Sequence, residues 1–356
     1  MKIAVYSPYL DTVGGGERYV LTIAEYLSKN HKTDFLLGTH LYNIDISKTI
    51  KRVKELHDLD LSKVNFIKSP IGKGSSIFSR LIFLKKYDWL FYLSDGSIFY
   101  SSAKNSVIHL QSPIPNRSNL TAKGRIKLSS WKLIMYNSKF TEENAKQLWP
   151  KKSVVIYPPI SIEKLKSLQK KKQIISVGRF AADTKSKKHE VLIEAFKKLN
   201  EKEWSLYLVG GVMEGHEGYL RELKKIAKGF NIIFHNNMAF GDLAKLYGES
   251  QIYWHAAGFG ETDPTKMEHF GISTVEAMAS GCVPVVINLG GQKEIVQNGK
   301  SGFLWNSPQE MIEITTKLMA DKNLWGKVSK EALNRSKMFS KEKFCQNIER
   351  IVIGDS

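Results

Sequence analysis

Two carboxylates flank a glycine-containing turn in the stretch KMEHFGISTVEAMASGCVPVV, which runs from Lys266 to Val286. Glu268 precedes the turn, and Glu276 lies about one turn inside the helix that the following small residues predict. The first amides of such a helix have no partners within it, so they suit an anion or a dense set of hydroxyls. A carboxylate at each end of the turn can accept hydrogen bonds from an elongated ligand. A solvated acidic helix start, favoured by the helix dipole, explains the pair equally well when it is taken alone.

Cationic residues follow a second predicted strand. Arg179 comes directly after the run QIISVG, and Lys187 and Lys188 precede the next predicted helix. Cations at the mouth of an α/β unit suit a diphosphate that leaves with charge developing on it. For any one of them alone, an ordinary surface cation is the simpler interpretation.

Glycines open the first predicted helix. Gly14, Gly15 and Gly16 follow the first strand, but a dinucleotide-binding fingerprint would need another glycine where Tyr19 stands. The loop is better suited to approach a sugar or a diphosphate, with a tight turn as the alternative. His109 ends an apolar strand in VIHLQSP, where a structural hydrogen-bonding role is the commoner one. His40, His255 and His269 are weaker candidates.

Strand and helix patterns alternate along the chain, and the continuous apolar runs suit parallel strands that are buried on both faces. We therefore expect an α/β protein with two Rossmann-like, doubly wound domains, residues 1–165 and 170–335, facing a central ligand cleft. The Lys-rich stretch 164–172 is predicted to link them. Residues 336–356 should form a helix that crosses back to the first domain, with Phe344, Ile348 and Ile351 as its buried stripe.

Composition excludes several classes of protein. The chain has 356 residues, 42% of them hydrophobic, and only two cysteines, so we expect neither a disulfide framework nor a cysteine-based metal site. No apolar stretch approaches the roughly 20 residues that span a bilayer, and no signal peptide is expected at Met1. Asp58 and Asp60 form a DxD that is better explained as solvated acids. We predict a cytoplasmic protein without an essential metal or other cofactor.

The net charge of +18 is concentrated in one region. Residues 61–141 contain 13 Lys and Arg but only two acids. Within this region, residues 77–86 mix apolar side chains with Arg80, Lys85 and Lys86, a composition that fits either a helix lying in a membrane interface or a core helix with a basic edge. The regional charge favours an anionic membrane surface. Nucleic-acid binding would rest on charge alone, because no aromatic–basic module of a known type accompanies it.

Several motifs together resemble the retaining GT-B glycosyltransferases of family 4. They are GRF…KK…LIEAF, EHFGISTVEAMASGCVPVV, GGQKEIV and NGKSGFLW, and the resemblance covers essentially the whole chain. The two glutamates match the family's E-x7-E signature. The pieces EHFGI, YPP and NSKFT are most similar to dolichol-pathway mannosyltransferases and related microbial enzymes.

The resemblance implies roles for the residues singled out above. It implies a nucleotide-sugar donor whose ribose is bound by Glu276 and whose diphosphate is bound by Arg179 and Lys187, with Lys188 as the alternative across an insertion. The transferred sugar would be held by Glu268 and the backbone of His269, Phe270, Gly271, Ile272 and Ser273. His109 would contact the donor sugar, although three residues separate it here from the proline that usually follows more closely. Gly15 and Gly16 match the family's glycine-rich loop.

The implied activity is transfer of a hexose, with retention, to a lipid-linked or other glycan acceptor. GDP-mannose is the first donor to test and UDP-glucose the second. Two alternatives remain open: a sugar-nucleotide-binding scaffold subunit without turnover, and a glucosyl-type transferase with a soluble acceptor.

Overall fold

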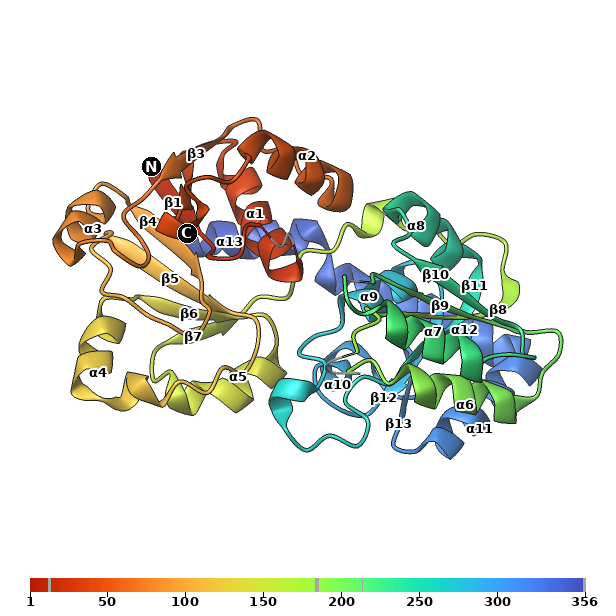
Figure 1. The fold of residues 1–356 in the computed structure, drawn as a ribbon. Coiled ribbons are helices and arrows are strands. Elements are labelled where there is room, and N and C mark those ends of the chain that lie inside the picture. The colour runs from red at the N-terminus through yellow and green to blue at the C-terminus, as the bar shows by residue number, and fades with distance from the viewer. Residues whose placement is uncertain (12–13, 183–185, 213, 355–356) are drawn as a thin grey trace. The chain divides into compact units, whose positions relative to one another are not determined.

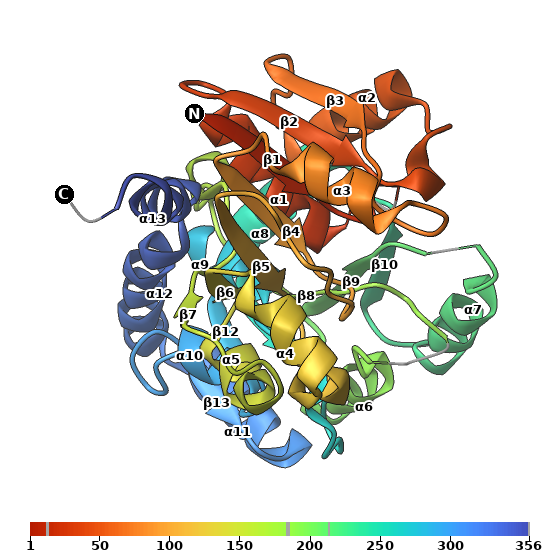
Figure 2. The same ribbon diagram turned by 90° about the vertical axis from the view of Figure 1, so that its left-hand side faces the viewer.

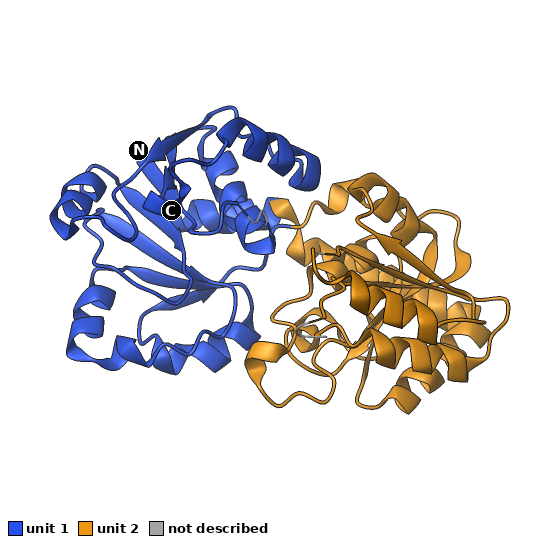
Figure 3. Ribbon diagram, viewed as in Figure 1, with its two compact units in different colours: residues 1–159, 342–356 blue, residues 160–341 orange. Residues whose placement is uncertain are grey.

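The computed structural model describes residues 1–11, 14–182, 186–212 and 214–354. It divides into two compact units, which are coloured separately in Figure 3. Unit 1 contains residues 1–159 and 342–356, and unit 2 contains residues 160–341. Each unit is built on one parallel sheet, as the continuous apolar runs in the sequence predict.

Unit 1 has a seven-stranded sheet with the order β3-β2-β1-β4-β5-β6-β7, and every pairing is parallel (Figure 1). The order reverses beside β1, which is the switch point of a doubly wound sheet. The strands are β1 (Lys2–Tyr6), β2 (Lys32–Leu37), β3 (Val64–Lys68), β4 (Trp89–Leu93), β5 (Asn105–Leu110), β6 (Leu133–Tyr136) and β7 (Ser153–Val155).

Helices cover both faces of this sheet, since alternate strand residues point to opposite sides and both sides are apolar. One core includes residues of α1, α2 and α13, and the other includes Leu84 of α3 and Leu128 of α4. Figure 2 shows α3 and α4 in front of the same face. The helices are α1 (Gly15–Leu27), α2 (Ile46–His57), α3 (Ile77–Leu84), α4 (Ala122–Ser129), α5 (Lys139–Ala145) and α13 (Lys341–Ile353).

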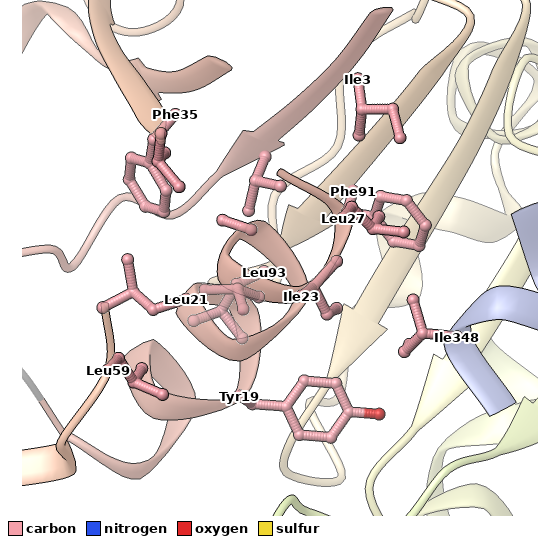
Figure 4. Close-up of a cluster of buried hydrophobic side chains, with 14 of the residues drawn as sticks. Ile3, Tyr19, Leu21, Ile23, Leu27, Phe35, Leu59, Phe91, Leu93 and Ile348 are labelled. Carbon is pink, nitrogen blue, oxygen red and sulfur yellow. The ribbon is translucent and has the colours of Figure 1, made fainter. Parts of the chain in front are cut away.

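The last helix, α13, completes the first of these cores. Its buried residues are Phe344, Cys345, Ile348 and Val352, and Ile351 packs partly buried beside them. The Phe344 ring meets the Tyr19 ring edge-on, with centroids 4.7 Å apart. Figure 4 shows Ile348 and Tyr19 within this cluster. Phe344, which follows Tyr19 by more than 300 positions in the sequence, therefore packs against the first helix of unit 1.

Unit 2 has a six-stranded parallel sheet with the order β10-β9-β8-β11-β12-β13. Its strands are β8 (Lys171–Val177), β9 (Ser205–Gly210), β10 (Ile232–Asn236), β11 (Ser250–His255), β12 (Val283–Ile287) and β13 (Phe303–Trp305). Its helices are α6 (His189–Leu199), α7 (Glu217–Ile226), α8 (Phe240–Glu249), α9 (Ile272–Ala279), α10 (Gln292–Ile295), α11 (Pro308–Ala320) and α12 (Lys322–Ser336). Across the described ranges of both units, no helix is long and apolar enough to cross a membrane.

Candidate active site

The candidate site lies at the carboxyl edge of the unit 2 sheet. Strand β11 ends at His255, β8 is followed by Gly178 and Arg179, and the loop before α9 carries Glu268. Because all strands of a parallel sheet point the same way, these three segments meet at one edge. This edge is where ligands bind in open α/β sheets.

Glu268 is the centre of a small charged cluster. Its Oε2 atom lies 2.5 Å from Lys187 Nζ and 3.1 Å from His255 Nε2, and its side chain is 19% exposed. Burial alone would raise the pKa of Glu268, but the ammonium of Lys187 and the hydrogen bond from His255 outweigh it and hold the pKa well below its usual range. Glu268 is therefore a carboxylate throughout the physiological pH range.

His255 fixes the orientation of that carboxylate. The imidazole is buried, and burial lowers its pKa even though Glu268 opposes the shift. A neutral imidazole that is hydrogen-bonded to a carboxylate must be the donor, because the carboxylate can only accept. The Nε2 atom of His255 therefore carries the proton and donates it in the hydrogen bond to Glu268 Oε2. The sequence placed His255 among weaker candidates, because a histidine at the end of one apolar strand looks the same whether or not a carboxylate approaches it from a distant loop.

The two lysines before α6 have different partners. Lys187 reaches Glu268, whereas Lys188 Nζ lies 2.7 Å from Glu261. A side chain at Gly178 would overlap the Lys187 stem, since an added Cβ would lie 2.7 Å from Lys187 Cγ. Arg179, the next residue, is exposed at the same strand end. The structure thus brings Lys187, rather than Lys188, to the candidate sugar-binding glutamate.

Helix α9 starts beside Glu268 with its first turn at the site edge. Its N-cap, Gly271, has φ 121°, a conformation that side chains disfavour. Ile272 and Ser273 are partly exposed, and the Ser273 hydroxyl lies 2.8 Å from that of Tyr253. Glu276 is 7% exposed in the second turn. Burial and then the charge of Glu276 hold the pKa of Tyr247 well above its usual range.

Two further glycines hold the loop that carries Glu268. The Gly291 amide donates to the Glu268 carbonyl oxygen at 2.8 Å. Added Cβ atoms would lie 2.2 Å from that oxygen at Gly290 and 2.5 Å from Phe270 Cα at Gly291. His269 donates from Nε2 to the Thr265 carbonyl oxygen, 3.2 Å away, and Phe270 is buried. Backbone packing therefore fixes the position of the loop, and any side chain at either glycine would displace it.

Lys170 is a partly buried residue that sequence reasoning missed. Its ammonium donates to the carbonyl oxygens of Ser250 at 2.8 Å and Ser280 at 2.7 Å, at the ends of α8 and α9. A cation at the carboxyl end of a helix is favoured by the helix dipole. Lys170 lies in a Lys-rich stretch that the sequence predicts to be a linker. Nothing in the local sequence distinguishes it from the exposed lysines around it.

His109 lies in the core of unit 1. It is 1% exposed, its Nδ1 lies 3.1 Å from the Met135 carbonyl oxygen, and its ring stacks on Tyr19 with centroids 3.8 Å apart. Burial lowers the pKa of His109 to about 3, against the opposing bond to Met135. Nδ1 therefore donates to the carbonyl, and the buried Nε2 atom has no hydrogen-bond partner among the described residues.

The glycine loop lies at the start of α1. The Gly14 amide donates to the Glu17 carboxylate at 2.8 Å, and Gly15 is the first residue of the helix. An added Cβ at Gly16 would lie 2.3 Å from the side-chain oxygen of Gln111, which follows β5. Gly16 therefore lets the end of the Gln111 side chain lie close to the start of α1, two residues from His109.

The predicted membrane helix is α3. Ile77, Phe78 and Ile82 are 65%, 72% and 62% exposed, and Lys85 and Lys86 are also exposed. Arg80 departs from its expected place among the outward cations: its guanidinium lies 5.1 Å from the Phe99 ring centroid, and burial lowers its pKa. The amphipathic pattern alone could not show this, because long Arg side chains pack their stems on apolar neighbours as readily as they extend to solvent.

Comparison with known proteins identifies a family that part of this chain matches. Residues 159–335 match the family of glycosyl transferases group 1. The GDP-Man:Man(3)GlcNAc(2)-PP-Dol alpha-1,2-mannosyltransferase of Dictyostelium discoideum is 28% identical over 239 residues, which are 60% of this chain and 45% of that protein. The human protein of the same description is 28% identical over 240 residues, 60% of this chain and 46% of its own length. The chain thus spans less than half the length of these curated relatives.

Solved structures share the fold across the whole chain. Anabaena Alr3699/HepE, in complex with UDP and glucose, aligns over 100% of both chains with a TM-score of 0.74 and 19% identity. A glycosyltransferase from Rickettsia africae aligns with a TM-score of 0.75 and 18% identity, over 100% of this chain and 99% of its own. These likenesses confirm the expected fold class, the two Rossmann-like sheets of GT-B glycosyltransferases. Residues 159–335, about half of the chain, thus form a glycosyl transferases group 1 domain.

Because His109 is buried as a neutral ring, stability should depend on pH. Its folded pKa of about 3 lies below the usual value of about 6.5, so protons bind the unfolded chain more readily and stability falls as pH drops below 6.5. Between pH 7.5 and 5.5 this loss is about 1.4 kcal/mol for one histidine. Urea unfolding of His109→Gln, whose side chain does not titrate, should show a pH-dependent loss smaller by that amount. Equal losses in the variant and the wild type would contradict this account.

Proposed function

We propose that the protein transfers a mannosyl group from GDP-mannose, with retention, to a hydroxyl of a lipid-linked glycan. The observation that carries the proposal is the position of Glu268, an ionised carboxylate held by His255 and Lys187 beside the first turn of α9, where Ile272 and Ser273 are partly exposed. A fixed carboxylate next to the amino end of a helix suits a polyhydroxylated ligand that also carries an anion.

Each residue has a proposed role in binding the donor. Glu276 accepts hydrogen bonds from the ribose hydroxyls, and Glu268 together with the backbone from His269 to Ser273 holds the transferred sugar. Arg179 and Lys187 stabilise the departing diphosphate, whose negative charge is greatest in the transition state.

In the proposed reaction the bond between the sugar C1 and the diphosphate oxygen breaks, and the acceptor oxygen bonds to C1 on the same face. The proton of the acceptor hydroxyl passes to the departing diphosphate. An oxocarbenium-like positive charge develops transiently at C1, and the ionised Glu268 nearby stabilises it electrostatically. Cationic side chains supply the positive charge in this scheme, and we propose no essential metal.

The proposed donor and acceptor are inferred from the names of the relatives, which specify GDP-Man and a dolichol-linked glycan. An anionic membrane is the proposed third partner, because a lipid-linked acceptor lies at a membrane surface. The exposed apolar side chains of α3, flanked by Lys85 and Lys86, fit that surface. We place the protein on the cytoplasmic face, bound peripherally.

A panel of nucleotide sugars tests the proposal directly. GDP-mannose should raise the thermal stability more than UDP-glucose does, since a ligand that binds only the folded state stabilises it by mass action. Transfer to a lipid-linked acceptor should then proceed equally well in EDTA. Stabilisation by GDP-mannose without transfer or hydrolysis would instead support the non-catalytic scaffold, and preference for UDP-glucose with a soluble acceptor would support the glucosyl-type alternative.

Removing Glu276 should weaken donor binding. In the proposed role, the Glu276 carboxylate accepts two charge-assisted hydrogen bonds from the ribose hydroxyls. Glu276→Ala should therefore cost roughly 2–4 kcal/mol of donor-binding free energy, measured by calorimetry. Glu261→Ala, which removes a carboxylate paired with Lys188 rather than one in α9, serves as the control and should bind the donor like wild type. Unchanged affinity in the Glu276 variant would contradict the ribose role.

The two lysines before α6 should differ in their effect on turnover. Lys187→Ala should lower kcat more than it raises KM, because the diphosphate carries most charge in the transition state. Lys188→Ala is the matched control, one position away and paired with Glu261 instead of Glu268. Steady-state kinetics in which Lys188→Ala is the damaged variant would assign the diphosphate to Lys188.

Membrane binding should depend on both the charge and the apolar side chains of α3. In vesicle flotation the protein should bind anionic vesicles, dissociate as salt rises, and lose binding in Lys85→Ala/Lys86→Ala and in Phe78→Ser/Ile82→Ser. Lys51→Ala/Arg52→Ala removes two exposed cations of α2, on the other face of the sheet, and should bind normally. Failure of wild type to float with anionic vesicles at low salt would leave a soluble acceptor as the better proposal.

A further inference from the structure

Unit 1 contains a cavity that the proposed reaction does not use. It has a volume of about 510 Å³ and lies between α13, the amino ends of β4 and β6, and the edge strand β7, which lines it along its whole length. Ligands of GT-B sheets are expected at the opposite, carboxyl edge. The volume is within the range of small-molecule sites, about 300–1,000 Å³.

The walls of this cavity combine apolar and cationic side chains. Trp89, which is 4% exposed, and the partly buried Leu133, Val154 and Ile351 contribute apolar surface. Three cations also line it, and no acid is found among its described lining residues. The cations are Lys132, Lys152 and Arg350.

The cations are not neutralised by the protein around them. Lys132 Nζ lies 4.8 Å from the Trp89 ring centroid and donates to the neutral side chain of Asn105 at 3.0 Å. Within the described ranges, Lys152 and Arg350 are exposed and their side chains have neither a hydrogen bond nor an ion pair. Glu142 accepts a hydrogen bond from Ser153 but does not line the cavity. The cavity therefore has a positive potential above an apolar floor.

We propose that this cavity binds an anionic amphiphile, with its phosphate or carboxylate group on Lys152 and Arg350 and its aliphatic body against Leu133, Val154 and Ile351. A purely inorganic anion would leave the apolar surface uncovered, and a neutral chain would leave three like charges together. Only a molecule with both parts satisfies both surfaces. The ligand contacts both the edge of the sheet and α13, so it stabilises the docking of the last helix.

Isothermal titration of the full chain with decyl phosphate, kept below its critical micelle concentration, tests the proposal. One molecule should bind per chain, at least tenfold more tightly than inorganic phosphate or decanol. Lys152→Glu/Arg350→Glu should weaken binding at least tenfold, and Lys152→Ala/Arg350→Ala by a smaller factor. Decanoate distinguishes the two headgroups, since tighter binding of decanoate indicates a carboxylate ligand and tighter binding of decyl phosphate indicates a phosphate.

Two controls separate this cavity from the other cationic surfaces of unit 1. Lys51→Glu/Arg52→Glu, on α2, and Phe78→Ser/Ile82→Ser, on α3, should bind decyl phosphate like wild type. Loss of binding in the α3 variant, or unchanged binding in Lys152→Glu/Arg350→Glu, would overturn the proposal. Neither result depends on glycosyl transfer, so the cavity and the proposed activity can fail independently.

Discussion

An ionised carboxylate withdrawn from most of its water is the constraint on which the unit 2 site depends. Glu268 keeps its charge only because Lys187 and His255 compensate for the lost hydration. Loss of either partner would leave this partly buried carboxylate without compensation, so the three side chains must be placed together. They come from the loop before α6, the end of β11 and the loop before α9. The parallel sheet meets this requirement, because it gathers the carboxyl ends of its strands at one edge.

The same constraint explains why glycines surround the site. Lys187 passes over Gly178, and the Glu268 backbone rests on Gly290 and Gly291, where an added Cβ would overlap neighbouring atoms. Gly271 allows the chain to turn from the Glu268 loop directly into α9. These glycines act by close approach and by backbone conformation. The close packing that they allow holds the carboxylate relative to the first turn of the helix.

Sequence reasoning predicted the fold better than the contacts. The alternating apolar runs predicted parallel, doubly wound sheets, because strands buried on both faces leave a continuous apolar signal. They did not reveal α2 or β3, whose mixed polar residues carry a weaker pattern. Glu268 and Lys187 could be singled out from local motifs, but His255 and Lys170 could not. Their partners lie 13 or more positions away along the chain, and no local spacing encodes such a meeting.

The environment of His109 also depends on contacts between residues that are far apart in the sequence. Its ring stacks on Tyr19, the Tyr19 hydroxyl donates to the Ile156 carbonyl oxygen at 2.9 Å, and Phe344 packs edge-on against the same tyrosine. The position of Tyr19 is thus defined by segments from the start, the middle and the end of the chain. Because burial keeps His109 neutral, its Nε2 atom remains an acceptor at any pH where the core is intact. Helix α13 therefore contributes to the neutral state of His109 without contacting it, by completing the core that excludes water from the imidazole.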